Sequence, residues 1–183
     1  MLENYKKHVA ERAEQNIPPL PLDADQTSEL IELLKKDHQE SDFLLDLLKE
    51  RVPAGVDQAA YVKAAFLADI TTGKASSPYI TKIDAVKILG TMLGGYNIQP
   101  LIECLKDNEL AEAAAHVLSR TLLIFDAFND IFELSKTNEH AKKVVEEWAN
   151  ATWFTEKTDI EEQIKRTVYK VTGEINTDDL SPA

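Results

Sequence analysis

Apolar residues recur at helical spacing along almost the whole chain, and this periodicity restricts the fold to packed helices. The clearest case runs from Leu110 to Phe125, where apolar residues follow one another at intervals of three and four residues. Because an α-helix turns once in about 3.6 residues, that interval places them on one continuous face. Glycines, prolines and capping residues interrupt the pattern at short intervals. The sequence therefore predicts an all-α fold built from many short helices.

Local signals set the ends of these helices. Asp57, Thr81 and Asn97 can each cap a helix with a side-chain oxygen, and Asp23 or Thr27 can begin an earlier one. Three prolines in residues 18–21 exclude a helix there, since proline favours extended backbone. Helices are expected at 2–15, 42–51, 58–71, 82–93, 98–106, 109–124, 126–135 and 138–152, besides the one that begins near 23 or 27.

The later helices pair through short connections, and the pairs begin every 30–40 residues or so. The pairs are 58–71 with 82–93, 98–106 with 109–124, and 126–135 with 138–152. We predict a HEAT-like stack of antiparallel helix pairs from this spacing, although the pairs share little sequence. An irregular helical bundle is the alternative. Within the helix at 58–71 we expect its alanines to allow close packing, with Tyr61, Phe66 and Leu67 filling the remaining space.

The pattern changes near residue 160. Residues 167–172 are β-branched and aromatic, which favours a strand. Because one strand cannot form a sheet, we expect a helical domain over 1–158. Residues 159–183 are then expected to be a linker and the truncated start of a second domain. The last part of this stretch, 173–183, is expected to be turn and loop.

The charge of the chain argues against several classes of partner. With 20 basic and 32 acidic residues the net charge is -12. Nucleic-acid binding is not expected of this segment, because such binding rests on Lys and Arg neutralising phosphates. Anionic lipids gain no attraction either, and no apolar run reaches membrane-spanning length. The N-terminus lacks the apolar core of a signal peptide, so we expect a cytoplasmic protein.

Few residues suggest chemistry. His8, His38, His116 and His140 lack a second ligand at metal-binding spacing, so we interpret them as surface or interface residues. Cys104, the single cysteine, reads as a small buried side chain. The segment 90–95 contains three glycines, but it lacks phosphate-loop spacing and follows a helix. We interpret it as a helix end with a tight backbone approach. No metal site is predicted.

Several stretches together resemble the bacterial aconitase B family. They are residues 3–12 (ENYKKHVAER), 51–57 (RVPAGVD), 60–64 (AYVKA), 89–98 (LGTMLGGYNI) and 171–183 (VTGEINTDDLSPA). They span the chain in the family's order. The resemblance implies a non-catalytic, HEAT-like N-terminal region followed by the opening of a swivelling domain.

The family's full-length enzyme interconverts citrate and isocitrate through cis-aconitate with a [4Fe-4S] cluster. The resemblance implies that the cluster ligands and main catalytic groups lie in later domains, so this segment has no catalytic residue and no cofactor of its own. It also implies contacts with the rest of the chain, self-association, contacts with other metabolic enzymes, and a border on the substrate channel. A free-standing helical-repeat adaptor is the alternative function.

One short C-terminal motif is expected to lie near the active site of the full enzyme. Asp178 and Asp179 are paired carboxylates, which can bind a metal or transfer protons but on a loop more often cap turns. By the resemblance, Asp178, Asp179 and Ser181 belong to the family's DDLSPA element and lie at the active-site edge of the full enzyme. No catalytic role is assigned to them.

Overall fold

The computed structural model describes residues 1–121, 127–156, 163–168, 170 and 173, and its contacts divide the chain into two compact units. One unit is Pro21–Thr158; the other joins Met1–Leu20 to Asp159–Ala183. All regular structure in the described ranges is helical, which confirms the predicted all-α class. The elements are α1 (Leu2–Glu14), α2 (Ala24–Leu34), α3 (Ser41–Glu50), α4 (Gln58–Thr72), α5 (Lys82–Gly90), α6 (Ile98–Cys104), α7 (Ala111–Leu118), α8 (Phe128–Ser135), α9 (Glu139–Ala149) and α10 (Thr152–Thr155).

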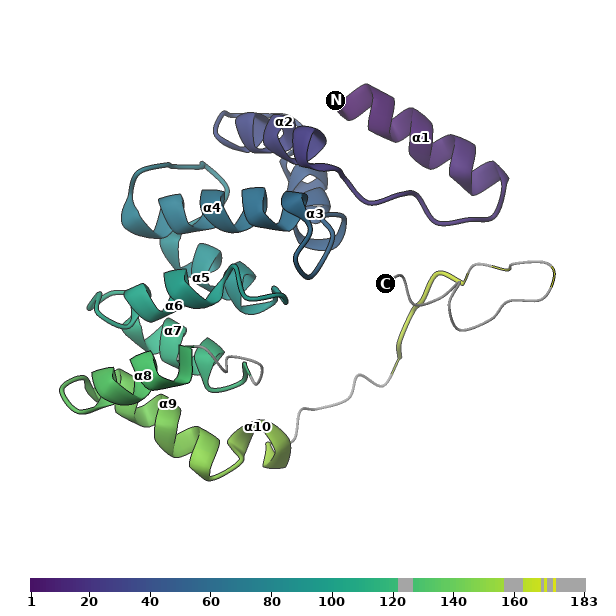
Figure 1. Ribbon diagram of the computed structural model, residues 1–183. Coiled ribbons are helices and arrows are strands. Elements are labelled where there is room, and N and C mark those ends of the chain that lie inside the picture. Colours follow the sequence, from purple (N-terminus) through teal and green to yellow (C-terminus); the bar gives the residue numbers. More distant parts are fainter. Residues whose placement is uncertain (122–126, 157–162, 169, 171–172, 174–183) are drawn as a thin grey trace. The chain divides into compact units, whose positions relative to one another are not determined.

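In the larger unit, consecutive helices pack as pairs and each pair packs on the next. The pairs are α2 with α3, α4 with α5, α6 with α7, and α8 with α9. Between pairs, α2 contacts α4, α5 contacts α7, and α7 contacts α9. Figure 1 shows α4 to α9 following one another through this unit. The contacts are those of stacked helix pairs, while the assignment to HEAT-like repeats stays a prediction.

Leucine side chains form most of the interior of this unit. Burial of such side chains is the main favourable contribution to folding. Twelve of the leucines that the structure describes are almost completely buried: Leu22, Leu30, Leu34, Leu44, Leu47, Leu48, Leu67, Leu89, Leu101, Leu105, Leu110 and Leu118. On α4, Ala59, Ala60 and Ala64 are also buried, so this helix lies close to its neighbours. Tyr61 is an exception to the prediction, because its side chain is exposed and does not fill the core.

Most predicted helix starts are correct because they depend on adjacent residues. Asp23 and Thr81 each form a reciprocal capping box, and Asp57 accepts a hydrogen bond from the Ala59 amide. Gly73 ends α4 with a left-handed backbone, a conformation that glycine adopts readily. Asn97 precedes α6, but its side chain makes no capping hydrogen bond. That prediction is wrong, and its side chain has a different role described below.

The helix predicted over 109–124 is shorter than expected. α7 ends at Leu118, and side chains take up carbonyl groups of its last turn. The Thr121 hydroxyl donates to the Val117 carbonyl, and the Trp148 indole of α9 donates to the Leu118 carbonyl at 3.0 Å. Residues 122–125 of the predicted stripe lie outside the described part of the chain. Tertiary hydrogen bonds of this kind satisfy the orphan carbonyls of a helix end, and a periodicity argument does not include them.

The smaller unit contains α1 and the proline-rich segment that follows it. Three hydrogen bonds that involve side chains of α1 join the two. The Tyr5 hydroxyl donates to the Leu20 carbonyl at 3.0 Å, the Leu20 amide donates to His8 Nε2 at 2.9 Å, and Arg12 Nε donates to the Pro18 carbonyl at 2.8 Å. The segment therefore runs back along the helix, after a turn at Asn16, whose φ is +56°.

The strand predicted over 167–172 is not formed where the structure describes it. Thr167, Val168 and Lys170 carry no regular secondary structure, and the remaining three positions lie outside the described residues. A lone β-branched segment needs a paired neighbour to become a strand, so local propensity alone does not decide its structure. The predicted domain boundary at 158 and 159 stays a prediction.

Candidate functional site

Among the residues that the structure describes, the four histidines do not gather into one centre. Asp178, Asp179 and Ser181 lie outside the described residues. His8 accepts the Leu20 amide, and His38 Nδ1 accepts the Glu40 amide at 3.0 Å. His140 lies 3.5 Å from Glu112, and His116 is exposed. All four histidines are at least partly exposed, which agrees with their interpretation as surface or interface residues.

Cys104 is buried on α6, as predicted, and burial raises the pKa of its thiol. A raised pKa disfavours the thiolate, which is the form that ligates metals. A cluster of three or more His, Cys, Asp or Glu side chains suited to a metal does not occur among the described positions. A [4Fe-4S] cluster is held by several cysteine thiolates, and this chain has one cysteine. The residues of this chain therefore do not fit such a cluster.

Gly90 and Gly94 of segment 90–95 serve packing, in agreement with the prediction of a tight backbone approach. A Cβ at Gly90 would meet the Val117 side chain on α7, so α5 and α7 pack closely there. A Cβ at Gly94 would overlap the backbone of Gly55, which belongs to the loop between α3 and α4. Gly94 also has φ +91°. These positions bring two loops of the larger unit into backbone contact.

Asn97 holds one of these loops in place. Its side chain is buried, and its amide nitrogen donates to the carbonyls of Leu89 at 2.8 Å and Met92 at 3.1 Å. These carbonyls lie at the end of α5 and just beyond it, so Asn97 caps the C-terminus of α5 instead of the N-terminus of α6. We call residues 91–97 the glycine loop.

Replacement of Asn97 by Ala should lower the free energy of unfolding by about 2 kcal/mol, because the Leu89 and Met92 carbonyls lose their hydrogen bonds from this buried amide. Urea denaturation followed by far-UV circular dichroism measures the change. Asn108→Ala is the control, since Asn108 is exposed and its loss should change stability by less than about 0.5 kcal/mol. Equal effects of the two substitutions would contradict the role given to Asn97.

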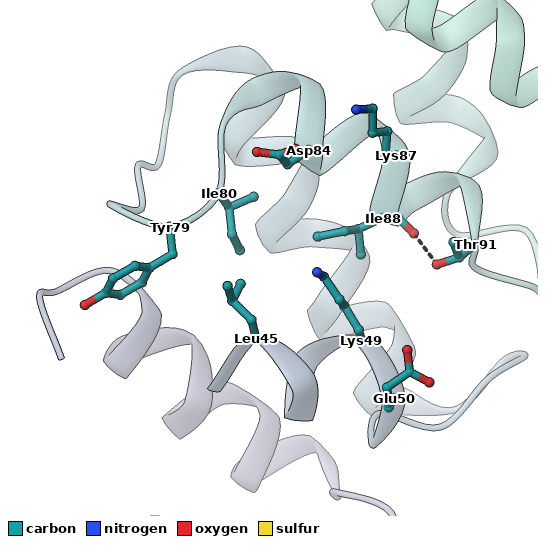
Figure 2. Close-up of a pocket in the computed structure, with 9 residues that line it drawn as sticks. All are labelled: Leu45, Lys49, Glu50, Tyr79, Ile80, Asp84, Lys87, Ile88 and Thr91. Atoms are coloured by element: carbon teal, nitrogen blue, oxygen red, sulfur yellow. Dashed lines mark hydrogen bonds between the residues drawn. The ribbon is translucent and has the colours of Figure 1, made fainter. Parts of the chain in front are cut away.

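A groove of about 450 Å³ lies between α3 and α5. Leu45, Ile80 and Ile88 form its apolar walls, and Lys49 from α3 points between them (Figure 2). Tyr79 points away from the centre of the view, and its hydroxyl donates to Asp37 at 2.8 Å. The groove therefore combines apolar walls with the ammonium group of Lys49.

The remaining charges of the groove are distributed around its edge. Lys87 and Asp84 come from α5, and Glu50 ends α3. Hydrogen bonds from Thr81 and the charges of Lys87 and Lys49 lower the pKa of Asp84, so this carboxyl stays ionised. The groove can hold a small acidic and apolar group, but it brings together no nucleophile with a base.

Lys63 is an unusual titratable residue that the sequence analysis did not single out. It lies on α4 with only 4% of its surface exposed. Its Nζ donates to the Lys49 carbonyl at 3.4 Å, near the end of α3. Burial lowers its pKa to about 8, with Glu50 opposing that shift. Ala59, Ala60 and Leu67 lie three or four residues from Lys63, on the same face of α4. Because this face is apolar, the sequence could have indicated the burial of Lys63.

No helix of the described ranges is both long and apolar enough to cross a bilayer.

Comparison with known proteins shows which family the chain is related to. The family model described as the aconitate B N-terminal domain matches residues 4–154.

Three curated relatives are aconitate hydratase B proteins that match this chain over its entire length. The protein of Escherichia coli K12 is 58% identical over 185 residues, that of a Synechocystis strain 56% over 186, and that of Helicobacter pylori J99 49% over 184. The chain spans only 21–22% of the length of these relatives. These matches confirm the resemblance found in the sequence, and the chain belongs to the aconitate hydratase B family as its N-terminal domain.

Proposed function

We propose that this chain is the non-catalytic, protein-interacting N-terminal domain of an aconitate hydratase B. The full chain would interconvert citrate and isocitrate through cis-aconitate in the tricarboxylic acid cycle, with a [4Fe-4S] cluster held by later domains. The observation that supports this most is the match of the whole chain, at 49–58% identity, to one fifth of aconitate hydratase B relatives.

The chemistry of the chain's own residues supports a non-catalytic role. Removal of water from a hydroxy acid requires a base for one proton and an acid for the leaving hydroxyl. The groove between α3 and α5 is lined by two lysines and two carboxylates. One of these carboxylates, Asp84, already accepts hydrogen bonds from Thr81. One buried thiol cannot supply the ligands of an iron–sulfur cluster. The arrangement is suited to holding and docking.

The partners follow from the same proposal. The rest of the aconitase chain is the first, and a second copy of the protein and other metabolic enzymes are further candidates. The domain would border the substrate channel of the complete enzyme in the cytoplasm. A net charge of -12 disfavours nucleic acid and anionic membranes as partners.

The proposal predicts that the 183-residue chain, expressed alone, contains no stoichiometric iron and does not turn over cis-aconitate. After cluster reconstitution, the longer chain that contains it should hold iron and turn over cis-aconitate. Absorbance of cis-aconitate and metal analysis provide the measurements, and far-UV circular dichroism shows that the short chain is helical. Turnover by the short, iron-free chain would refute the non-catalytic role.

The alternative is a free-standing helical-repeat adaptor, and the groove between α3 and α5 is the feature that favours it. Its apolar walls and Lys49 would suit an acidic, partly apolar peptide. The two proposals predict different lengths for the open reading frame that encodes the chain. An open reading frame that continues into cysteine-bearing domains supports the aconitase proposal, and one that stops near Ala183 supports the adaptor.

A further inference from the structure

Two loops of the larger unit form an apolar surface that is firmly held. The loop between α3 and α4 meets the glycine loop where Gly94 lies against the Gly55 backbone. The Tyr96 hydroxyl donates to the Val56 carbonyl at 3.2 Å. Tyr61, from the first turn of α4, contacts the Tyr96 ring edge to face, with ring centres 5.4 Å apart. We call Val56, Tyr61, Leu93 and Tyr96 the tyrosine patch.

The apolar side chains of the tyrosine patch are presented to the outside. Val56 is 75% exposed, Leu93 is 65% exposed and Tyr61 is 51% exposed. Single exposed apolar residues are ordinary, whereas a group of them on one surface marks an interaction site. Gly55 and Gly94 both adopt positive φ, and Asn97 fixes the end of the glycine loop. The backbone is thus held in an uncommon conformation that keeps these side chains on the surface.

The tyrosine patch also lacks charge. Residues 88–102 contain no Asp, Glu, Lys or Arg, although such residues make up 28% of the chain. Residues 52–56 are likewise uncharged. Depletion of charge with enrichment of tyrosine is the composition of the centre of a protein–protein interface. A loop that faces only water is expected to carry charged and polar side chains instead.

We infer that the tyrosine patch is the surface on which the later domains of the aconitate hydratase B polypeptide dock. This inference rests on the proposed function. The relatives are almost five times as long as this chain, so each carries a large further body of protein on the same polypeptide. A covalently linked partner has a high effective concentration, which favours its docking over that of a separate molecule. A second copy is the weaker candidate, because two chains of net charge -12 repel each other.

Cysteine labelling of the full-length enzyme tests the docking surface. Leu93→Cys and Val56→Cys replace two exposed side chains whose removal leaves the core intact, and Lys74→Cys provides a matched control at an exposed loop position. Each variant reacts with iodoacetamide in the native state and in urea, and peptide mass spectrometry gives the two rates at the introduced cysteine. Docking should slow native labelling at positions 93 and 56 by about tenfold or more relative to urea, while position 74 changes far less.

The outcomes separate the possible occupants. Protection at 93 and 56 that is independent of protein concentration supports docking within one polypeptide. Protection that disappears on dilution means that a second copy covers the patch, and it overturns the inference. Native rates at 93 and 56 as fast as at 74 overturn it too. Because cis-aconitate turnover is measured on the same preparations, an active enzyme with an unprotected patch refutes the inference while the proposed function stands.

Discussion

Gly94→Ala should lower the free energy of unfolding by about 4 kcal/mol, because two unfavourable effects act together. The first is backbone strain, since Gly94 has φ +91°, where an L-residue is unfavourable. The second is steric overlap, since the new Cβ would lie inside the Gly55 backbone. A backbone cannot move aside as a flexible side chain can. The loop between α3 and α4 would have to separate from the glycine loop.

Gly95→Ala separates the two effects. Gly95 has nearly the same backbone, with φ +95°, but its Cβ would meet no atom within 4 Å. Strain alone should lower stability by about 1 kcal/mol. Urea denaturation of both variants gives the difference, which measures the overlap. A destabilisation of Gly94→Ala no larger than that of Gly95→Ala would show that the two loops do not touch as described.

The same two loops show how far sequence reasoning extends. Asp57 and Thr81 could be identified as caps because the amides that they bind lie two and three residues further along the chain. Asn97 has the residue type of a cap, but its backbone at φ -84° and ψ -20° is helical instead of extended. Its partners are the carbonyls of Leu89 and Met92, at the end of the preceding helix. Only the fold determines that choice.

Tyr61 illustrates the other limit. Its neighbours on α4 are buried alanines, so periodicity favours a core position. Its ring instead contacts Tyr96, which lies 35 residues further along and reaches Tyr61 because Gly94 approaches Gly55. Glycine spacing predicted a tight approach but gave no partner for it. The fold class, the starts of most helices and the family could therefore be predicted from the sequence. The contacts between loops, which form the tyrosine patch, could not.

Lys63→Met should stabilise the protein at neutral pH by about 3 kcal/mol, since a pKa change of one unit corresponds to about 1.4 kcal/mol. The ammonium group is buried and has a single, long hydrogen bond to the Lys49 carbonyl. Burial lowers its pKa from 10.5 to about 8, so the folded state disfavours the protonated form. Methionine has a similar length and no charge, and exchange of a buried charge for a well-packed apolar side chain is often stabilising.

The pH dependence gives the sharper measurement. Between pH 8 and 10.5 the unfolded chain holds a proton on Lys63 that the folded chain has lost. The free energy of unfolding of the wild type should therefore rise with pH across this window relative to that of Lys63→Met. Below the window the full unfavourable contribution of the ammonium remains, and above it the contribution disappears. The stability difference between the two proteins should shrink accordingly as pH increases.

Lys74→Met controls for the loss of a lysine as such, because Lys74 is exposed. Its stability difference from the wild type should stay within about 0.5 kcal/mol at each pH. Urea denaturation at several pH values between neutrality and the end of the window provides the data for all three proteins. A Lys63→Met difference that stays constant with pH would mean that the ammonium is as well solvated in the folded state as in the unfolded one. In that case Lys63 would not be enclosed at this position of α4, and its hydrogen bond to the Lys49 carbonyl of α3 would not form as the structure has it.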